Sequence, residues 1–174
     1  LPTGEWERWP ENRRAAISPV RGQGLLSFEG DCVVRERIDV VFPVLHGENG
    51  EDGAMQGLLQ LAGIPYVGPH VAASAVSMDK TLTKLVMDQA NIPQAAWQLV
   101  RASELVESKL DRILGALEQR FDYPMFVKPA GTGSSVGVSK ASNRNALAHA
   151  LISAGRYDEK ILVEEFIRGR EVEV

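Results

Sequence analysis

The stretch "KPAGTGSSVGVSK", residues Lys128–Lys140, puts a lysine at the end of an apolar run and follows it with a loop rich in glycine and serine. An alternating Val/polar segment comes next, so the pattern predicts two antiparallel strands joined by this loop. Its glycines expose backbone N–H groups, and Ser134 and Ser135 add hydroxyl donors. These donors could surround phosphate oxygens while Lys128, held on the strand, supplies a compact positive charge.

Two interpretations of this loop stay open from the segment alone. The lysine precedes the glycines and no helix follows directly, so the loop is not the common P-loop that opens a helix. One interpretation is a hairpin lid over phosphates, residues 128–140. The other is an ordinary hairpin turn with a surface lysine, because Gly and Ser are common in such turns.

Charged residues far away in the sequence favour the phosphate interpretation. Lys80 lies in "SMDK", at the predicted start of a helix, and could supply a second cation. The segment "LVEEF", residues 162–166, could form a nucleotide hinge in which Glu164 and backbone groups contact an adenine edge. Glu171 could accept ribose hydroxyls. Each carboxylate is informative only in combination with the others, since a glutamate at a strand end is usually solvated.

Composition restricts the class of protein. The 174 residues are 44% hydrophobic and 24% charged, which is typical of a soluble globular chain. A net charge of −4 argues against a general nucleic-acid binder. A single cysteine, Cys32, excludes an internal disulfide and favours a reducing compartment, the cytoplasm. No apolar run approaches the length of about 18 residues that a membrane span needs, so no membrane partner is expected.

The first part of the chain predicts an α/β domain over residues 1–69. The continuous apolar run "IDVVFPVLHG", residues 38–47, is typical of a buried parallel strand. A helix with Gly63 as its C-terminal glycine and a short strand, "IPYVG", complete a βαβ unit with a parallel, Rossmann-like sheet. Residues 1–37 are expected to be irregular apart from one hairpin that turns at residues 29–31.

The second part predicts an α+β region of hairpins and amphipathic helices, with the boundary at residues 68–70. Strands are expected around "AAWQLV", "YPMFVKP", "SSVGVSKA", "KILVEEFI" and "REVEV". Ser103 is expected to cap one helix, and either Ser142 or Asn143 another. Residues 70–163 form the central subdomain, and 164–174 begin a further one. Since the chain lacks an initiator Met and stops inside an alternating stretch, we expect truncation at both ends.

Four segments occur in one order along the chain: "HGENGEDG" (46–53), "SMDK" (77–80), "KPAGTGSSVG" (128–137) and "LVEEFIRGREV" (162–172). Their order and spacing resemble the D-alanine–D-alanine ligases of the ATP-grasp superfamily over about residues 38–174. Other ATP-grasp enzymes share the lysines and the loop but not the His-Gly segment. The resemblance implies an N-terminal α/β domain followed by an ATP-grasp region. It also implies ATP with Mg²⁺ or Mn²⁺, ligation through an acyl phosphate, and a product used for peptidoglycan.

The resemblance also implies roles for individual residues. The candidate ATP-binding residues are Lys80, Lys128, Ser134, Ser135, Glu164, Glu165, Ile167 and Glu171, and the candidate catalytic residues are Ser134 and His46. His46 would lie beside the first D-alanine, although a histidine after a buried strand is often only structural. Glu51 and Asp52 are expected to orient His46 and cap the following helix rather than to react themselves.

Other parts of the family pattern are expected outside this sequence. The metal ligands and the remaining catalytic residues should come after Val174, so the isolated chain is expected to form no dipeptide. The resemblance implies a homodimer through the N-terminal domain. Three alternatives stay open: a D-alanine–D-lactate ligase, a D-alanine–D-serine ligase, and an ATP-binding fragment without catalysis.

Overall fold

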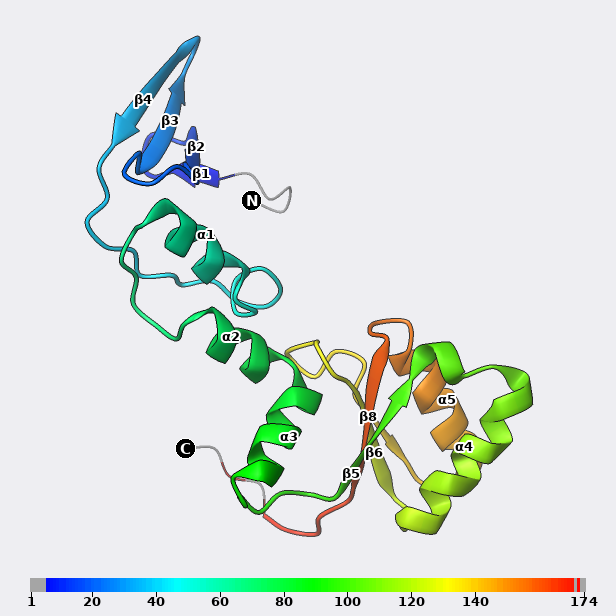
Figure 1. The fold of residues 1–174 in the computed structure, drawn as a ribbon. Helices are drawn as coiled ribbons and strands as arrows, with labels where there is room; N and C mark the ends of the chain where they lie inside the picture. Colours follow the sequence, from blue (N-terminus) through cyan, green and yellow to red (C-terminus); the bar gives the residue numbers. More distant parts are fainter. Residues whose placement is uncertain (1–5, 171, 173–174) are drawn as a thin grey trace. The chain divides into compact units, whose positions relative to one another are not determined.

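The computed structural model describes residues 6–170 and 172 and divides into two compact units, Leu1–Ala75 and Val76–Val174 (Figure 1). The division falls inside helix α2 (Val71–Met78), a few residues after the boundary predicted at 68–70. Each unit has its own sheet and its own core, and each is described separately below.

The first unit contains a four-stranded antiparallel sheet in the order β1-β2-β3-β4. Its strands are β1 (Trp6–Arg8), β2 (Arg13–Ile17), β3 (Leu25–Glu29) and β4 (Cys32–Glu36). The predicted hairpin is confirmed, with Glu29 opposite Cys32 and Gly30 in the left-handed region at φ 59°. The expectation that the rest of residues 1–37 is irregular was wrong. The strands have three to five residues each, too few for a sustained period in the sequence.

Helix α1 (Ala54–Ala62) packs against this sheet through an apolar face. Leu59 and Ala62 are fully buried, in a cluster that includes Ile17 from β2. The helix ends at Gly63 as predicted, because the left-handed backbone there, φ 68°, suits a residue without Cβ.

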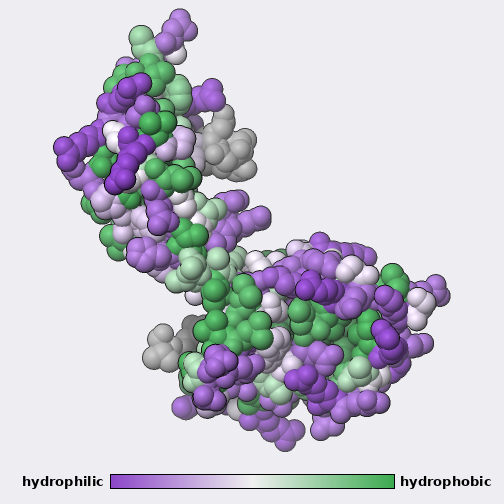
Figure 2. All heavy atoms as spheres, viewed as in Figure 1, coloured by the Kyte–Doolittle hydropathy of each residue, from purple (hydrophilic) through white to green (hydrophobic). Residues whose placement is uncertain are grey.

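The apolar run at residues 38–45 does not form the buried parallel strand that the sequence predicts. Among the described residues it makes one isolated parallel bridge, between Val41 and Tyr66. The side chains of Val40, Phe42 and Val44 are 59%, 70% and 68% exposed, and Figure 2 shows hydrophobic residues at the surface of this unit. A parallel strand needs paired neighbours and covered faces. The parallel, Rossmann-like sheet is therefore not confirmed, and the unit's sheet is antiparallel.

The second unit is a four-stranded antiparallel sheet in the order β5-β8-β6-β7. The strands are β5 (Trp97–Arg101), β6 (Met125–Pro129), β7 (Ser139–Ala141) and β8 (Lys160–Glu165), and the helices are α3 (Lys80–Gln89), the 3₁₀ turn η1 (Ala102–Glu104), α4 (Glu107–Arg120) and α5 (Arg144–Ala154). Helices α4 and α5 cover one face, and α3 lies on the other side near β8 (Figure 1). The predicted α+β character of this part is confirmed, with Leu117, Leu147 and Leu151 in its core.

The capping predictions had different outcomes. Asn143, rather than Ser142, caps α5 by accepting a hydrogen bond from the Ala146 N–H at 3.0 Å. Ser103 was the wrong residue for α4, because it lies in η1 and its hydroxyl donates to Glu159 at 2.5 Å instead. The N-cap of α4 is Val106, whose side chain cannot accept a hydrogen bond.

The strand predicted at residues 134–141 is confirmed only for its last three residues, in β7. Ser134 and Ser135 have positive φ values, 49° and 58°, so the backbone turns there instead of extending. Most of the strand predicted at residues 170–174 lies outside the described residues. No helix in the described part of the chain is both long enough and apolar enough to span a bilayer.

Candidate nucleotide-binding site

A cavity of about 780 Å³ lies within the second unit, between the start of α3, β6, the loop after it and the end of β8. The residues that line it include Lys80, Lys128, Ser134, Ser135, Glu164, Glu165 and Ile167. Seven of the predicted residues thus meet at one cavity although they come from four separate segments. Glu171 lies outside the described residues, and His46 belongs to the first unit.

Lys80 is held by the loop that follows β6. It is the first residue of α3, and its backbone N–H donates to the carbonyl of Ala130 at 3.0 Å. Its ammonium donates to the same carbonyl at 3.2 Å and to the carbonyl of Thr132. Burial lowers the pKa of Lys80, and the nearby charge of Lys128 lowers it further. Both lysines line the same cavity, so they can act on one anion.

Asp79 fixes the position at which α3 begins. One carboxylate oxygen accepts from the N–H groups of Thr81 and Leu82, at 2.9 and 3.2 Å, as an N-cap does. The other oxygen pairs with Lys160 on β8. Burial alone would raise the pKa of Asp79, but the hydrogen bonds from Lys160 and Thr81 outweigh it and leave the pKa below its ordinary value.

Glu164 places a buried carboxylate in the cavity lining, and the residue is only 6% exposed. One oxygen pairs with Lys128, and the other lies 2.6 Å from the ammonium of Lys84. Burial would raise the pKa of Glu164, yet the two lysines more than offset that effect and keep the carboxylate ionised. Sequence reasoning missed Lys84. Its spacing of four residues from Lys80 was the available signal, since such residues share a helix face.

Aromatic side chains form an apolar wall of the cavity. The rings of Phe126 and Phe166 lie 6.0 Å apart, and the ammonium of Lys140 is 4.1 Å from the centre of the Phe166 ring. Glu165 also lines the cavity, and its carboxylate accepts from the Ala96 N–H at 2.7 Å. A flat apolar wall beside cations and hydroxyls is suited to a ligand with a ring and an anionic tail.

The loop between β6 and β7 borders the cavity with exposed donors. Ser134 and Ser135 are exposed, and Thr132 closes a turn by donating to the Val136 carbonyl at 3.0 Å. Asp158 accepts from the Gly131 N–H at 2.5 Å, so the loop is tied down at its base. The arrangement can present hydroxyl and N–H groups to phosphate oxygens.

His46 is exposed and precedes a segment whose shape two carboxylates maintain. Glu51 accepts from the Gly47 N–H at 2.5 Å, and Asp52 accepts from Asn49 and Ala54 N–H groups at 2.8 and 2.9 Å. Those backbone hydrogen bonds, Ala54 foremost, lower the pKa of Asp52. The acidic pair thus orders the loop and covers an N–H at the start of α1. Contact of His46 with D-alanine stays a prediction.

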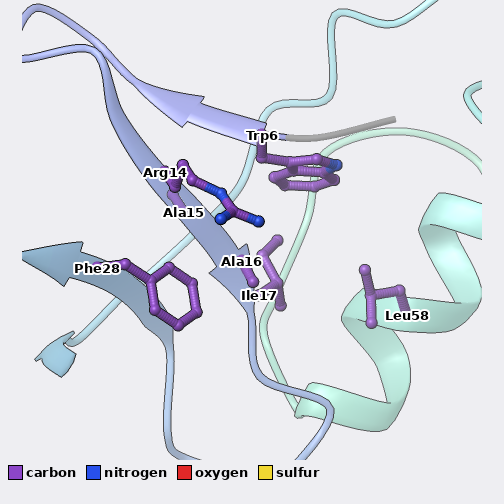
Figure 3. Close-up of a pocket in the computed structure, with 7 residues that line it drawn as sticks. All are labelled: Trp6, Arg14, Ala15, Ala16, Ile17, Phe28 and Leu58. Carbon is purple, nitrogen blue, oxygen red and sulfur yellow. The ribbon is translucent and has the colours of Figure 1, made fainter. Parts of the chain in front are cut away.

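A second cavity, of about 390 Å³, lies in the first unit between the sheet and α1 (Figure 3). It is lined by Trp6, Arg14, Ala15, Ala16, Ile17, Phe28 and Leu58. None of the predicted site residues borders it, and all of its lining side chains except Arg14 are apolar or aromatic.

A metal ion does not fit the described residues. Over residues 6–170 and 172, no group of three or more His, Cys, Asp or Glu side chains is arranged to hold one. Both carboxylates that line the cavity already have partners, Glu164 with lysines and Glu165 with a backbone N–H. The described residues therefore do not supply a metal site of their own.

Comparison with known proteins defines the class. Residues 7–69 match a family model described as "D-ala D-ala ligase N-terminus", and residues 86–174 match one described as "D-ala D-ala ligase C-terminus". Both models describe parts of a ligase, which fits a cavity that combines cations with an apolar wall. The chain belongs to the D-alanine–D-alanine ligase family.

Individual relatives agree with this assignment. The chain is 58% identical to a D-alanine–D-alanine ligase of Acetivibrio thermocellus, over 99% of the chain and 49% of the relative. The crystal structure of D-alanyl-alanine synthetase A from Vibrio cholerae is 30% identical with a TM-score of 0.79, over 91% of this chain and 45% of that one. VanG D-Ala:D-Ser ligase from Enterococcus faecalis is 33% identical, also with a TM-score of 0.79, over 92% and 45%. The chain spans about half the length of the relatives it matches.

Proposed function

We propose that this chain is part of an ATP-dependent ligase that joins two D-alanines for peptidoglycan precursor synthesis in the bacterial cytoplasm. The observation that carries the proposal is the convergence of Lys80, Lys128 and the Gly/Ser loop on one cavity, in a chain of this family. Mg²⁺ or Mn²⁺, bound by residues beyond those described, and a homodimer through the first unit belong to the proposal as well.

The proposed reaction explains why the site needs two lysines. A carboxylate oxygen of the first D-alanine attacks the γ-phosphorus of ATP, and ADP leaves. Both reactants are anions, so the barrier falls when cations and N–H donors neutralise the phosphates. In this proposal Lys80 and Lys128 supply those cations, and Ser134 and Ser135 supply hydroxyl donors.

The second step of the proposed reaction explains why a loop would need to cover the phosphates. The amine of the second D-alanine attacks the acyl phosphate, and inorganic phosphate leaves as the peptide bond forms. Water would hydrolyse the acyl phosphate, so the loop at residues 128–140 is proposed to close over it as a lid. His46 is proposed to contact the first D-alanine. Glu164, Glu165 and Ile167 are proposed to contact adenine, and Glu171 ribose.

A second candidate is a ligase that uses D-serine as the acceptor. The observation that favours it is the similarity to VanG D-Ala:D-Ser ligase, at 33% identity and a TM-score of 0.79. The donor step and the nucleotide site would be the same in both reactions, because only the attacking amine differs.

One experiment separates these candidates. The intact protein, meaning the whole ligase of which this chain is proposed to be part, is incubated with ATP, Mg²⁺ and D-alanine, alone and with D-serine or D-lactate. The products are identified by mass spectrometry. We expect D-alanyl-D-alanine and one ADP per dipeptide. Preferential D-alanyl-D-serine formation would support the second candidate, and ADP release without any ligated product would refute both.

A further inference from the structure

Lys84 and Lys128 contact opposite oxygens of the Glu164 carboxylate from different surroundings. Lys128 lines the cavity, and its side chain is 29% exposed. Lys84 is not among the residues that line the cavity, and its side chain is 13% exposed. Lys84, which lies outside the cavity lining, therefore pairs with Oε1 of Glu164. Lys128, which lines the cavity, pairs with Oε2.

Lys84 is fixed by its own surroundings. Its ammonium donates to the Ala95 carbonyl at 3.3 Å, and its backbone carbonyl accepts from the Gln94 side chain at 2.8 Å. Glu164 lies on β8, which is hydrogen-bonded to strands on both sides. The pair of Lys84 and Glu164 therefore joins α3 to the centre of the sheet at a defined geometry.

We propose that Lys84 is a positioning residue for base recognition: it holds one oxygen of Glu164 so that the other can accept a hydrogen bond from the 6-amino group of adenine. This inference rests on the proposed function. Lys128 pairs with the second oxygen in the structure, and in this proposal it turns to the phosphates when ATP binds. Glu164 Oε2 is then free for the base.

The electrostatics explain why a second lysine is needed. If Lys128 were the only partner of Glu164, its move to the phosphates would leave a buried carboxylate without a counter-charge. Such an unpaired buried charge is strongly unfavourable. With Lys84 in place, one ion pair persists throughout, so Lys128 can exchange its carboxylate partner for phosphate while Glu164 remains ionised.

The test compares ATP with ITP, whose base carries a 6-oxo group, an acceptor, in place of the 6-amino donor, so position 6 of the base can no longer donate to a carboxylate. Dissociation constants of both nucleotides are measured for the intact protein and for Lys84→Met, Lys84→Gln and Lys84→Arg. Lys109→Met, which removes an exposed lysine on α4, is the matched control. Circular dichroism checks that each variant is folded.

We expect the wild type and Lys109→Met to prefer ATP to ITP by about tenfold or more, as one charge-assisted hydrogen bond predicts. Lys84→Met should lose most of that preference through weaker ATP binding, Lys84→Gln should lose part of it, and Lys84→Arg should keep it. If Lys84→Met does not fold, Lys84→Gln decides the question.

Two results overturn the inference alone: a folded variant that keeps the wild-type ratio of the two constants, or one that weakens ATP and ITP equally. Equal weakening would mean that Lys84 merely supports the fold. A wild type that binds neither nucleotide would instead overturn the proposed function together with this inference.

Discussion

Asp79 combines two separable interactions at the start of α3, and substitution can tell them apart. Asp79→Asn keeps a side-chain oxygen that can cap the helix but removes the charge that pairs with Lys160. Asp79→Ala removes both. Because the helix begins with Lys80, the same residue also fixes a lysine of the proposed site.

The expected size of each effect follows from typical capping and ion-pair energies and from the exposure of the pair. Loss of an N-cap costs about 1 kcal/mol of stability. The side chain of Lys160 is 33% exposed and that of Asp79 14%, so solvent screens the ion pair to roughly 0.5–1 kcal/mol. We expect Asp79→Asn to lower the free energy of unfolding by about the ion-pair amount, and Asp79→Ala by about 1.5–2 kcal/mol, the sum of both.

The pH dependence follows from the lowered pKa of Asp79. A carboxylate whose folded-state pKa is depressed stabilises the protein above its ordinary pKa of 3.8 and loses that contribution as the pH falls through the folded-state pKa. Urea unfolding followed by circular dichroism measures it at pH 7 and in steps through the acid range below pH 3.8. The wild type and Asp79→Asn should converge in acid. Equal destabilisation by Asn and Ala at pH 7, or a gap that persists in acid, would refute the reasoning.

Three further predictions concern the site, a tyrosine and the core. Lys128→Met should raise the dissociation constant of the intact protein for ATP by about tenfold or more, because it removes a charge-assisted contact. An unchanged dissociation constant would exclude Lys128 from the site. Burial and the hydrogen bond to Glu118 raise the pKa of Tyr123 to about 12, so its contribution to stability is complete below about pH 10 and falls as the pH rises through about 12. Tyr123→Phe should remove a tyrosinate transition near pH 12 from an ultraviolet titration, and an unchanged titration curve would contradict this. Leu151 is fully buried, so Leu151→Ala should cost about 2–5 kcal/mol in urea unfolding, whereas a loss below 1 kcal/mol would show a loosely packed core.

Local signals predicted much of the second unit. Gly and Ser after Lys128 marked the loop, and Asn143 marked a helix start, because capping and turn chemistry depend on neighbours in sequence. The pair of Lys84 and Glu164 could not be predicted in the same way. It depends on β8 lying beside β5 and β6 in the sheet, an order that residue periodicity does not encode.

The first unit shows where composition misleads. The run at residues 38–45 is apolar enough for a buried strand, but burial depends on which segments cover it, and Val41 pairs there only with Tyr66 in the described part of the chain. The strands β1 and β2 escaped prediction because turns interrupt them after a few residues. The sequence thus predicted the strands of the second unit, where the candidate cavity lies, better than the sheet of the first unit.

The most direct test of the central claim is to label the site with an acyl-phosphate derivative of ATP, which transfers its acyl group to lysines beside the nucleotide phosphates. Peptide mass spectrometry then identifies the labelled lysines in the intact protein. We predict labelling at Lys80 or Lys128 that excess ATP prevents. Labelling confined to other lysines, or insensitive to ATP, would contradict the claim that this cavity binds nucleotide phosphates.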